Sequence, residues 1–302
     1  MSAPLSAGLW GVLATPFTQD AALVDEESLR REVALHRSVP STGLTVLGVF
    51  GEAAALDDDE RRRVVEVVAE ERGDLPLVVG LPGRTTRKAA AQGSAALDAA
   101  AGEVAGLMVQ VNTPRSAALA AHLRAVHEAT GAGIVVQDYP VVSGIRISPS
   151  DLLAAVDACP FVVAVKSESP PTAAVVAELA AGTAAPVFGG LGGVALLDEL
   201  AAGSAGAMTG FSYPEGLLAA LRGWREGGFS AARKAFAPWL PIAVFEAQPG
   251  VGLALRKEAL RRRGVFASAS VRAPAPPLPE RLVPLLAAHV EAVEALLATR
   301  TG

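Results

Sequence analysis

The stretch GIVVQDYPVVSGIRISPSDLLAAVDACPFVVAVK, residues 133–166, contains the pattern on which the fold depends. It begins with one apolar run, Gly133–Gln137, and ends with another, Phe161–Lys166. Both runs are short, rich in Val and adjacent to Gly or Pro, as is typical of strands buried on both faces of a parallel sheet. Between them, Ser148–Ala158 has the residue pattern of a helix. We therefore interpret the stretch as strand, helix, strand.

The same alternation runs along most of the chain. The runs expected to form strands are Gly11–Phe17, Leu44–Phe50, Leu75–Gly80, Gly106–Val111, Gly133–Gln137, Phe161–Lys166, Pro186–Gly190 and Gly206–Phe211. The helices expected to follow them are Glu26–Ser38, Asp58–Glu71, Thr85–Ala101, Ser116–Thr130, Ser148–Ala158, Pro171–Ala181, Gly193–Ala202 and Pro214–Glu226. Asp25 directly precedes the first helix and is suited to cap its N-terminus.

Eight strand–helix units of this size predict an α/β fold, the (β/α)8 or TIM barrel. An open doubly wound sheet is the alternative, but no GxGxxG sequence follows the first strand. We assign residues 1–226 to the barrel and residues 227–302 to a C-terminal helical extension packed on it. The helices expected in this extension are Phe229–Leu240, Gly252–Arg263 and Pro279–Thr299.

The composition excludes several classes of protein. The chain has 302 residues, of which 51% are hydrophobic, and a net charge of -5, so it is too apolar to be disordered. Its one cysteine, Cys159, excludes a disulfide framework and a Cys-based zinc site. A pI near 5.5 without a long basic run argues against a nucleic-acid partner.

The sequence also predicts a soluble protein without a bound cofactor. No apolar stretch reaches the roughly 20 residues that a membrane span needs, and the first ten residues lack a signal-peptide pattern. A cytoplasmic location is therefore expected. The histidines fall within predicted helices without the spacing of a metal pair, so neither a metal nor another cofactor is expected. They are His36, His122, His127 and His289.

Lys166 is the first candidate catalytic residue, because it ends an apolar strand and the active site of a barrel forms at the carboxyl ends of its strands. Burial favours the neutral amine, which can form a Schiff base with a carbonyl substrate. The alternative is a lysine that extends to solvent or pairs with Glu168.

Four further strand ends carry candidate residues. Gly48–Glu52 has two glycines, which suit either a backbone nest for a carboxylate or a simple turn. Gln137 and Tyr139 are two residues apart, so both can point inward with Asp138 turned away, or Asp138 can form a turn in a loop. Glycines near Gly190 and Gly206–Gly210 leave room for a ligand.

Together these positions resemble the dihydrodipicolinate synthase / N-acetylneuraminate lyase family of class I aldolase-type barrels over nearly the whole chain. Ala14–Phe17 is similar to the family's first-strand motif, Gly48–Glu52 to its GxxGE motif, and Lys166 to its Schiff-base lysine. Gln248–Gly264 followed by Arg272–Pro274 is similar to its C-terminal region.

The resemblance implies a lyase that acts on a small 2-oxo acid such as pyruvate. The Schiff base would act as an electron sink for bond breaking at the neighbouring carbon. The substrate carboxylate would be held around Val49 and Phe50. The resemblance also implies a homo-oligomer, either a tetramer or a dimer.

The chain departs from the synthases of this family at the proton relay. Val49 and Phe50 replace two threonines, Gln137 and Val111 replace two tyrosines, and Val142 replaces an arginine. Apolar groups and an amide cannot relay protons as hydroxyls do. We therefore expect that the protein is not a lysine-biosynthesis enzyme.

Other motifs resemble dehydratases of 2-keto-3-deoxy sugar acids, especially the L-2-keto-3-deoxyarabonate dehydratase type. They are the Gln-Asp-x-Pro-x-Ser-Gly pattern from Gln137 to Gly144, the stretch 166–171 and Met208–Gly210. The resemblance makes dehydration the leading hypothesis, with pyruvate-dependent aldol cleavage, a synthase-like condensation or an inactive 2-oxo-acid-binding barrel as alternatives. The catalytic candidates are Lys166, Gln137, Tyr139 and Glu168. The substrate-binding candidates are Val49, Phe50, Ser143, Gly190, Met208 and Thr209.

Overall fold

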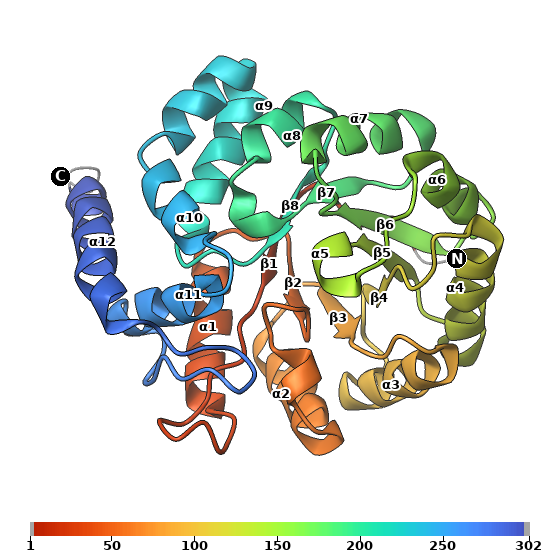
Figure 1. Ribbon diagram of the computed structural model, residues 1–302, viewed down its shortest axis with the longest axis horizontal. Helices are drawn as coiled ribbons and strands as arrows, with labels where there is room; N and C mark the ends of the chain where they lie inside the picture. The colour runs from red at the N-terminus through yellow and green to blue at the C-terminus, as the bar shows by residue number, and fades with distance from the viewer. Residues whose placement is uncertain (1–2, 299–302) are drawn as a thin grey trace.

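A computed structural model of the chain describes residues 3–298, and it confirms the predicted barrel (Figure 1). Each strand pairs in parallel with the next along the chain, and β8 pairs with β1 to close the barrel. The strands are β1 (Gly8–Val12), β2 (Gly43–Val46), β3 (Leu77–Leu81), β4 (Gly106–Gln110), β5 (Ile134–Asp138), β6 (Val162–Ser167), β7 (Val187–Gly189) and β8 (Gly206–Thr209). The closed sequential order excludes the open doubly wound sheet.

Helices surround the barrel and continue beyond its last strand (Figure 1). The barrel helices are α1 (Glu26–Ser38), α2 (Asp58–Glu71), α3 (Thr86–Ala99), α4 (Ser116–Thr130), α5 (Pro140–Ser143), α6 (Pro149–Asp157), α7 (Thr172–Gly182), α8 (Leu196–Ala201) and α9 (Pro214–Phe236). The later helices are α10 (Leu240–Glu246), α11 (Gly252–Arg262) and α12 (Val283–Ala298). Short 3-10 turns occur at Ala53–Ala55, Leu191–Gly193 and Glu280–Leu282. Asp25 caps α1 as predicted, because its side chain accepts a hydrogen bond from Ser28 N.

The first strand lies earlier in the chain than its apolar run predicts. The run Gly11–Phe17 is apolar except for Thr15, yet β1 ends at Val12. Beyond that point Leu13 and Phe17 are buried in the layer between strands and helices, and the C-terminal region adds further contacts. Lys257 Nζ lies 4.2 Å from the centre of the Phe17 ring, and the guanidinium carbon of Arg272 lies 4.4 Å from it on the same ring. The apolar run therefore predicted burial correctly, but it did not predict which of its residues pair in a strand.

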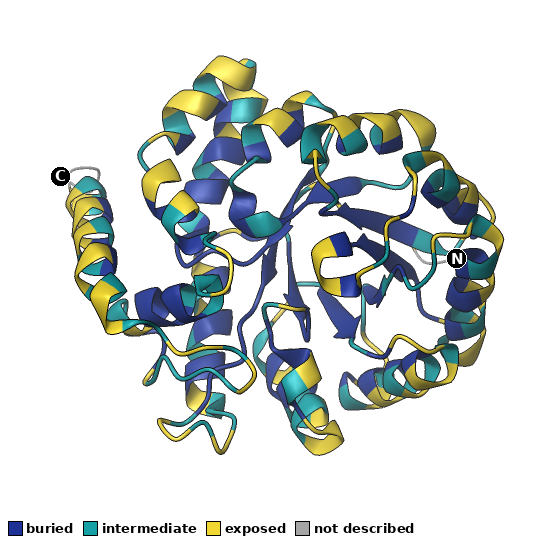
Figure 2. Cartoon of the chain, in the orientation of Figure 1, coloured by how far each residue is buried: buried dark blue, intermediate teal, exposed yellow. Residues whose placement is uncertain are grey.

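Side chains inside the barrel form a core separate from the layer between strands and helices. The interior cluster contains Trp10, Val12, Val78, Met108, Val135, Val163, Ala164, Phe188 and Met208. Val136 and Val165 belong to the outer layer, which the helices cover. Since side chains alternate along a strand, Gln137 shares its face with Val135, and Lys166 shares its face with Ala164. The buried strands inside their ring of half-exposed helices are visible in Figure 2.

The C-terminal region packs against the barrel. Helix α9 is kinked next to the expected boundary at 226/227, where Gly227 and Gly228 have non-helical backbone angles. A single apolar cluster contains Leu9 and Ala207 of the barrel together with Leu255 and Leu286 of the later helices. The division into a barrel (1–226) and an extension (227–302) stays a prediction, and Thr299, the last residue of the final predicted helix, lies outside the described residues.

Residues 3–298 are the part of the chain that the structure describes. No helix there is long and apolar enough to cross a membrane, and no three His, Cys, Asp or Glu side chains are grouped so that they could hold a metal ion. Cys159 is buried. All the histidines lie on helices, where His127 stacks on Phe161 and His289 packs against Phe245.

Candidate active site

Lys166 and Gln137 lie side by side at the carboxyl ends of β6 and β5. They are register partners between the two strands, and both side chains are buried, with Lys166 only 5% exposed. Their alternation with Ala164 and Val135 directs them into the barrel, as predicted. Asp138 follows Gln137 on β5, so its side chain lies on the opposite face of the strand. Burial raises the pKa of its carboxyl group to about 6.

Glu168 completes a polar cluster with these two residues. Its Oε2 lies 3.2 Å from Lys166 Nζ and accepts a hydrogen bond of 2.7 Å from Gln137 Nε2. Its Oε1 accepts a hydrogen bond of 3.3 Å from the backbone N of Leu191. Three donors from three strand ends therefore fix this carboxylate beside the amine. The structure thus brings together Lys166, Gln137 and Glu168, although a catalytic role for each stays a prediction.

Gly190 is required by the position of Glu168. A Cβ atom added at Gly190 would lie 2.3 Å from Glu168 Oε1, closer than atoms can approach. The next residues, Leu191–Gly193, form a 3-10 turn that Thr209 anchors, because its Oγ1 accepts a hydrogen bond of 2.7 Å from Gly192 N. Met208 lies below this level in the barrel interior. Thr209 therefore shapes the loop that contacts Glu168.

Tyr139 is half-buried at the start of the short helix α5, which the sequence patterns did not reveal. Burial raises the pKa of its phenol above the usual value, the charge of Glu168 raises it further, and the charge of Arg256 opposes both. A phenol with a raised pKa keeps its proton at neutral pH and can donate it.

Ser143 is placed differently from the other candidates. Its hydroxyl accepts a hydrogen bond from Ile145 N at 3.1 Å and donates one of 3.3 Å to Ile145 O. Its carbonyl oxygen accepts a hydrogen bond from the guanidinium of Arg84. The hydroxyl therefore stabilises its own turn, and the structure does not join it to the Lys166 cluster.

The glycine-rich turn after β2 presents two apolar side chains, Val49, which is 39% exposed, and Phe50, which is half-buried. Glu52, at the end of this turn, has a left-handed backbone with φ of 52°. Its carboxylate points to the C-terminal region, where it pairs with Lys257 and accepts a hydrogen bond of 2.9 Å from Arg272 N. Glu52 therefore acts as an anchor for the turn, outside the Lys166 cluster.

Arg256 is a site residue that the sequence reasoning missed. It comes from α11, and its guanidinium carbon lies 5.1 Å from the centre of the Phe50 ring. Burial lowers its pKa, and the charges of Glu246, Tyr139 and Glu168 oppose that shift, so these groups are its electrostatic neighbours. In the sequence it is one of several arginines on an amphipathic helix. The only available signal was Gly192, where a Cβ atom would lie 2.4 Å from Arg256 Nη2.

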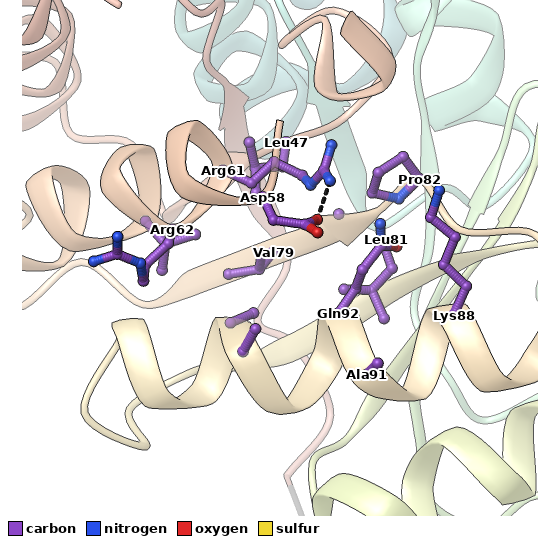
Figure 3. A pocket seen from close by; sticks show the side chains of 14 residues that line it. Leu47, Asp58, Arg61, Arg62, Val79, Leu81, Pro82, Lys88, Ala91 and Gln92 are labelled. Carbon is purple, nitrogen blue, oxygen red and sulfur yellow. Dashed lines mark hydrogen bonds and ion pairs between the residues drawn. The ribbon is translucent and has the colours of Figure 1, made fainter. Parts of the chain in front are cut away.

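The structure also contains a separate cavity of about 280 Å³ outside the barrel (Figure 3). Arg61 and Asp58 enter it from α2, and Lys88 and Gln92 enter it from α3, with Leu81 of β3 at its wall. None of the candidate site residues lines it. The predicted site residues therefore lie outside this cavity.

A closed (β/α)8 barrel with a buried lysine and a carboxylate at its strand ends is the arrangement of a Schiff-base lyase. The particular family follows from comparison. A sequence model of the dihydrodipicolinate synthetase family matches residues 5–293, so the chain belongs to that family. It is accordingly an enzyme, a lyase of the class I aldolase type that works through a lysine Schiff base, and the predicted resemblance is confirmed.

The proteins that this chain resembles are named for different activities. L-2-keto-3-deoxyarabonate dehydratase of Azospirillum brasilense is 31% identical over 299 residues, which cover 95% of this chain and 94% of the relative. The crystal structure of dihydrodipicolinate synthase from Rhodopseudomonas palustris has a TM-score of 0.88 at 26% identity and covers 96% of this chain and 98% of that one. Wild-type sialic acid aldolase of Ruminococcus gnavus shares the fold, with a TM-score of 0.84 at 18% identity over 97% of this chain and 98% of that one.

Proposed function

We propose that the protein dehydrates a 2-keto-3-deoxy sugar acid through a Schiff base at Lys166. The observation that carries this proposal is the contact between Glu168 and Lys166, supported by Gln137 at a position where the family's synthases use a tyrosine. The near full-length similarity to a 2-keto-3-deoxy sugar acid dehydratase adds to it.

The reaction begins when the neutral amine of Lys166 attacks the C2 carbonyl and a water molecule leaves, which gives an iminium ion. The iminium acidifies the C3 proton, which Glu168 accepts, and an enamine forms between C2 and C3. The enamine then expels the C4 hydroxyl, which leaves as water with a proton from Tyr139. Hydrolysis of the resulting unsaturated iminium frees Lys166 and an unsaturated 2-oxo acid.

The other candidate residues orient the substrate in this proposal. Gln137 holds the Glu168 carboxylate and can reach a substrate hydroxyl or a water. Backbone groups at Val49 and Phe50 hold the substrate carboxylate. Gly190 and Met208 leave space for the carbon chain, and Thr209 fixes the neighbouring loop.

Ser143 is the least supported of the proposed contacts, because its hydroxyl already bonds within its own turn. We keep it as a contact to a substrate oxygen only at the outer end of the site. From the family resemblance we also propose a cytoplasmic homotetramer or homodimer, whose mass light scattering can measure.

The test is product identification across a panel of 2-keto-3-deoxy acids. The proposal predicts a product that keeps every substrate carbon and has lost one water, with no turnover by a Lys166→Ala variant. Release of pyruvate with an aldehyde would instead show aldol cleavage, and the dehydration proposal would be wrong. Absence of turnover with every 2-keto-3-deoxy acid of the panel would also contradict the dehydration proposal.

A further inference from the structure

The guanidinium of Arg256 is buried at the barrel mouth without the partners that such a group normally has. The side chain is only 13% exposed, and its Nε has no hydrogen-bond partner in the part of the chain that the structure describes. Its ion-pair partner Glu246 lies 3.7 Å away, beyond hydrogen-bonding distance. A buried guanidinium with unused donors is costly in the free protein, so an anionic ligand would be bound strongly there.

The Leu191–Gly192 backbone connects Arg256 to the Lys166 cluster. Leu191 N donates a hydrogen bond to Glu168, and the Arg256 Nη2 atom lies only 2.4 Å from the place that a Cβ at Gly192 would occupy. Successive residues of one turn therefore touch Glu168 and Arg256. The glycine at position 192 leaves the space that the guanidinium fills.

Arg256 also lies over the turn at which the substrate carboxylate is expected. Its guanidinium carbon is 5.1 Å from the centre of the Phe50 ring. Neither Val49 nor Phe50 has a side-chain hydroxyl that could donate to a carboxylate. Guanidinium groups bind carboxylates through two parallel hydrogen bonds, which are stronger than bonds between neutral groups. An arginine from α11 can thus add side-chain donors to the backbone groups of this turn.

We propose that Arg256 binds the C1 carboxylate of the 2-oxo acid while its C2 carbon is attached to Lys166. The inference rests on the proposed Schiff-base function, and it makes α11 part of the substrate site. It also assigns Glu246 a role as a positioning residue, because its buried carboxylate lies beside Arg256 and accepts hydrogen bonds from the hydroxyl and backbone N of Ser212.

The experiment compares two carbonyl compounds in borohydride trapping: pyruvate, and acetone, which has no carboxylate. Each is titrated against the wild type and Arg256→Met, and the half-saturating concentration for adduct formation is measured by intact mass. We expect Arg256→Met to raise that concentration for pyruvate about 10- to 100-fold and to leave the acetone value unchanged. Arg256→Lys, which keeps the charge without the planar fork, should give an intermediate increase.

Arg261→Gln is the matched control, because Arg261 lies on the same helix and binds Glu258 away from the mouth. This variant should have the same half-saturating concentrations for pyruvate and acetone as the wild type. The inference is wrong if Arg256→Met traps pyruvate at the same half-saturating concentration as the wild type. It is also wrong if the half-saturating concentrations for pyruvate and acetone rise equally, or if the substitution raises this concentration only for longer sugar acids. A wild type that traps neither compound nor any other 2-oxo acid would instead remove the proposed function, and this inference with it.

Discussion

Glu168 and Lys166 face each other across 3.2 Å at the end of β6, and both side chains are buried. They are separated by one residue, Ser167, at which β6 ends. Both side chains enter the same site. The backbone N of Glu168 donates a hydrogen bond of 2.8 Å to Asp138 O, which holds that exit in place. The amine therefore has a fixed proton acceptor beside it.

Glu168→Gln should abolish most of the activity without preventing folding. Glutamine has the same shape but cannot accept a proton, and loss of a general base costs about 10²- to 10⁴-fold in rate. We expect kcat to fall by that factor while borohydride still traps substrate on the protein. Steady-state kinetics and intact mass would check this. A variant with unchanged kcat would show that Glu168 is only an ion-pair partner of Lys166.

Tyr139→Phe should slow loss of the C4 hydroxyl, because the substituted ring has no proton to donate. The raised pKa of the tyrosine implies that the wild-type phenol stays protonated at neutral pH. We expect kcat to decrease by about 10²-fold. Trapping of pyruvate, which has no leaving hydroxyl, should be unaffected. If pyruvate trapping is lost together with kcat, Tyr139 has a binding role and the assignment as general acid is contradicted.

The buried pair of Glu52 and Lys257 should hold the C-terminal region on the barrel. Lys257 is fully buried and also donates a hydrogen bond of 2.9 Å to Ser270 O. Lys257→Met leaves the Glu52 carboxylate without its cation, which typically costs about 3–5 kcal/mol of unfolding free energy. Urea denaturation measures this cost. The double variant with Glu52→Gln should recover part of it, and a single variant as stable as the wild type would show that the pair contributes nothing.

Glu32 should make stability depend on pH in a defined direction. Its carboxyl group is buried and accepts a hydrogen bond from Ala14 N, and burial raises its pKa from 4.5 to about 8. Between these two pKa values the folded chain binds a proton that the unfolded chain has lost, so stability decreases as pH rises from 4.5 to 8. Glu32→Gln should remove this part of the decrease, which thermal unfolding across that pH range can measure. An identical pH profile for both proteins would contradict the prediction.

The barrel could be predicted because each buried strand is a short apolar run and each helix has its own periodicity. The helices Glu26–Ser38, Asp58–Glu71 and Ser116–Thr130 have the predicted bounds. The first strand was misplaced, because the apolar residues after Val12 are buried partly by helices of the barrel and partly by the C-terminal region, where Ala14 packs against Leu260 and Phe266. Local apolarity reports burial and cannot show which part of the chain provides it.

The site was only partly predictable for a similar reason. Strand alternation and the family resemblance were enough to indicate Lys166, Gln137 and Glu168, because these residues lie on adjacent strand ends. Arg256 lies on a helix after the barrel, among arginines that a surface helix would also contain. Its role depends on how α11 packs over the mouth, which is a tertiary contact without a local sequence signal.

In the proposed reaction Lys166 forms the Schiff base, and this role can be tested by mapping the trapped adduct. The protein is reduced with borohydride in the presence of a 2-oxo acid, digested and analysed by peptide mass spectrometry. We expect one modified peptide, which contains Lys166, and no modification in Lys166→Ala. The other lysines, Lys88, Lys234 and Lys257, serve as internal controls. An adduct on any of these lysines, or no adduct across a panel of 2-oxo acids, would show that Lys166 does not form the Schiff base.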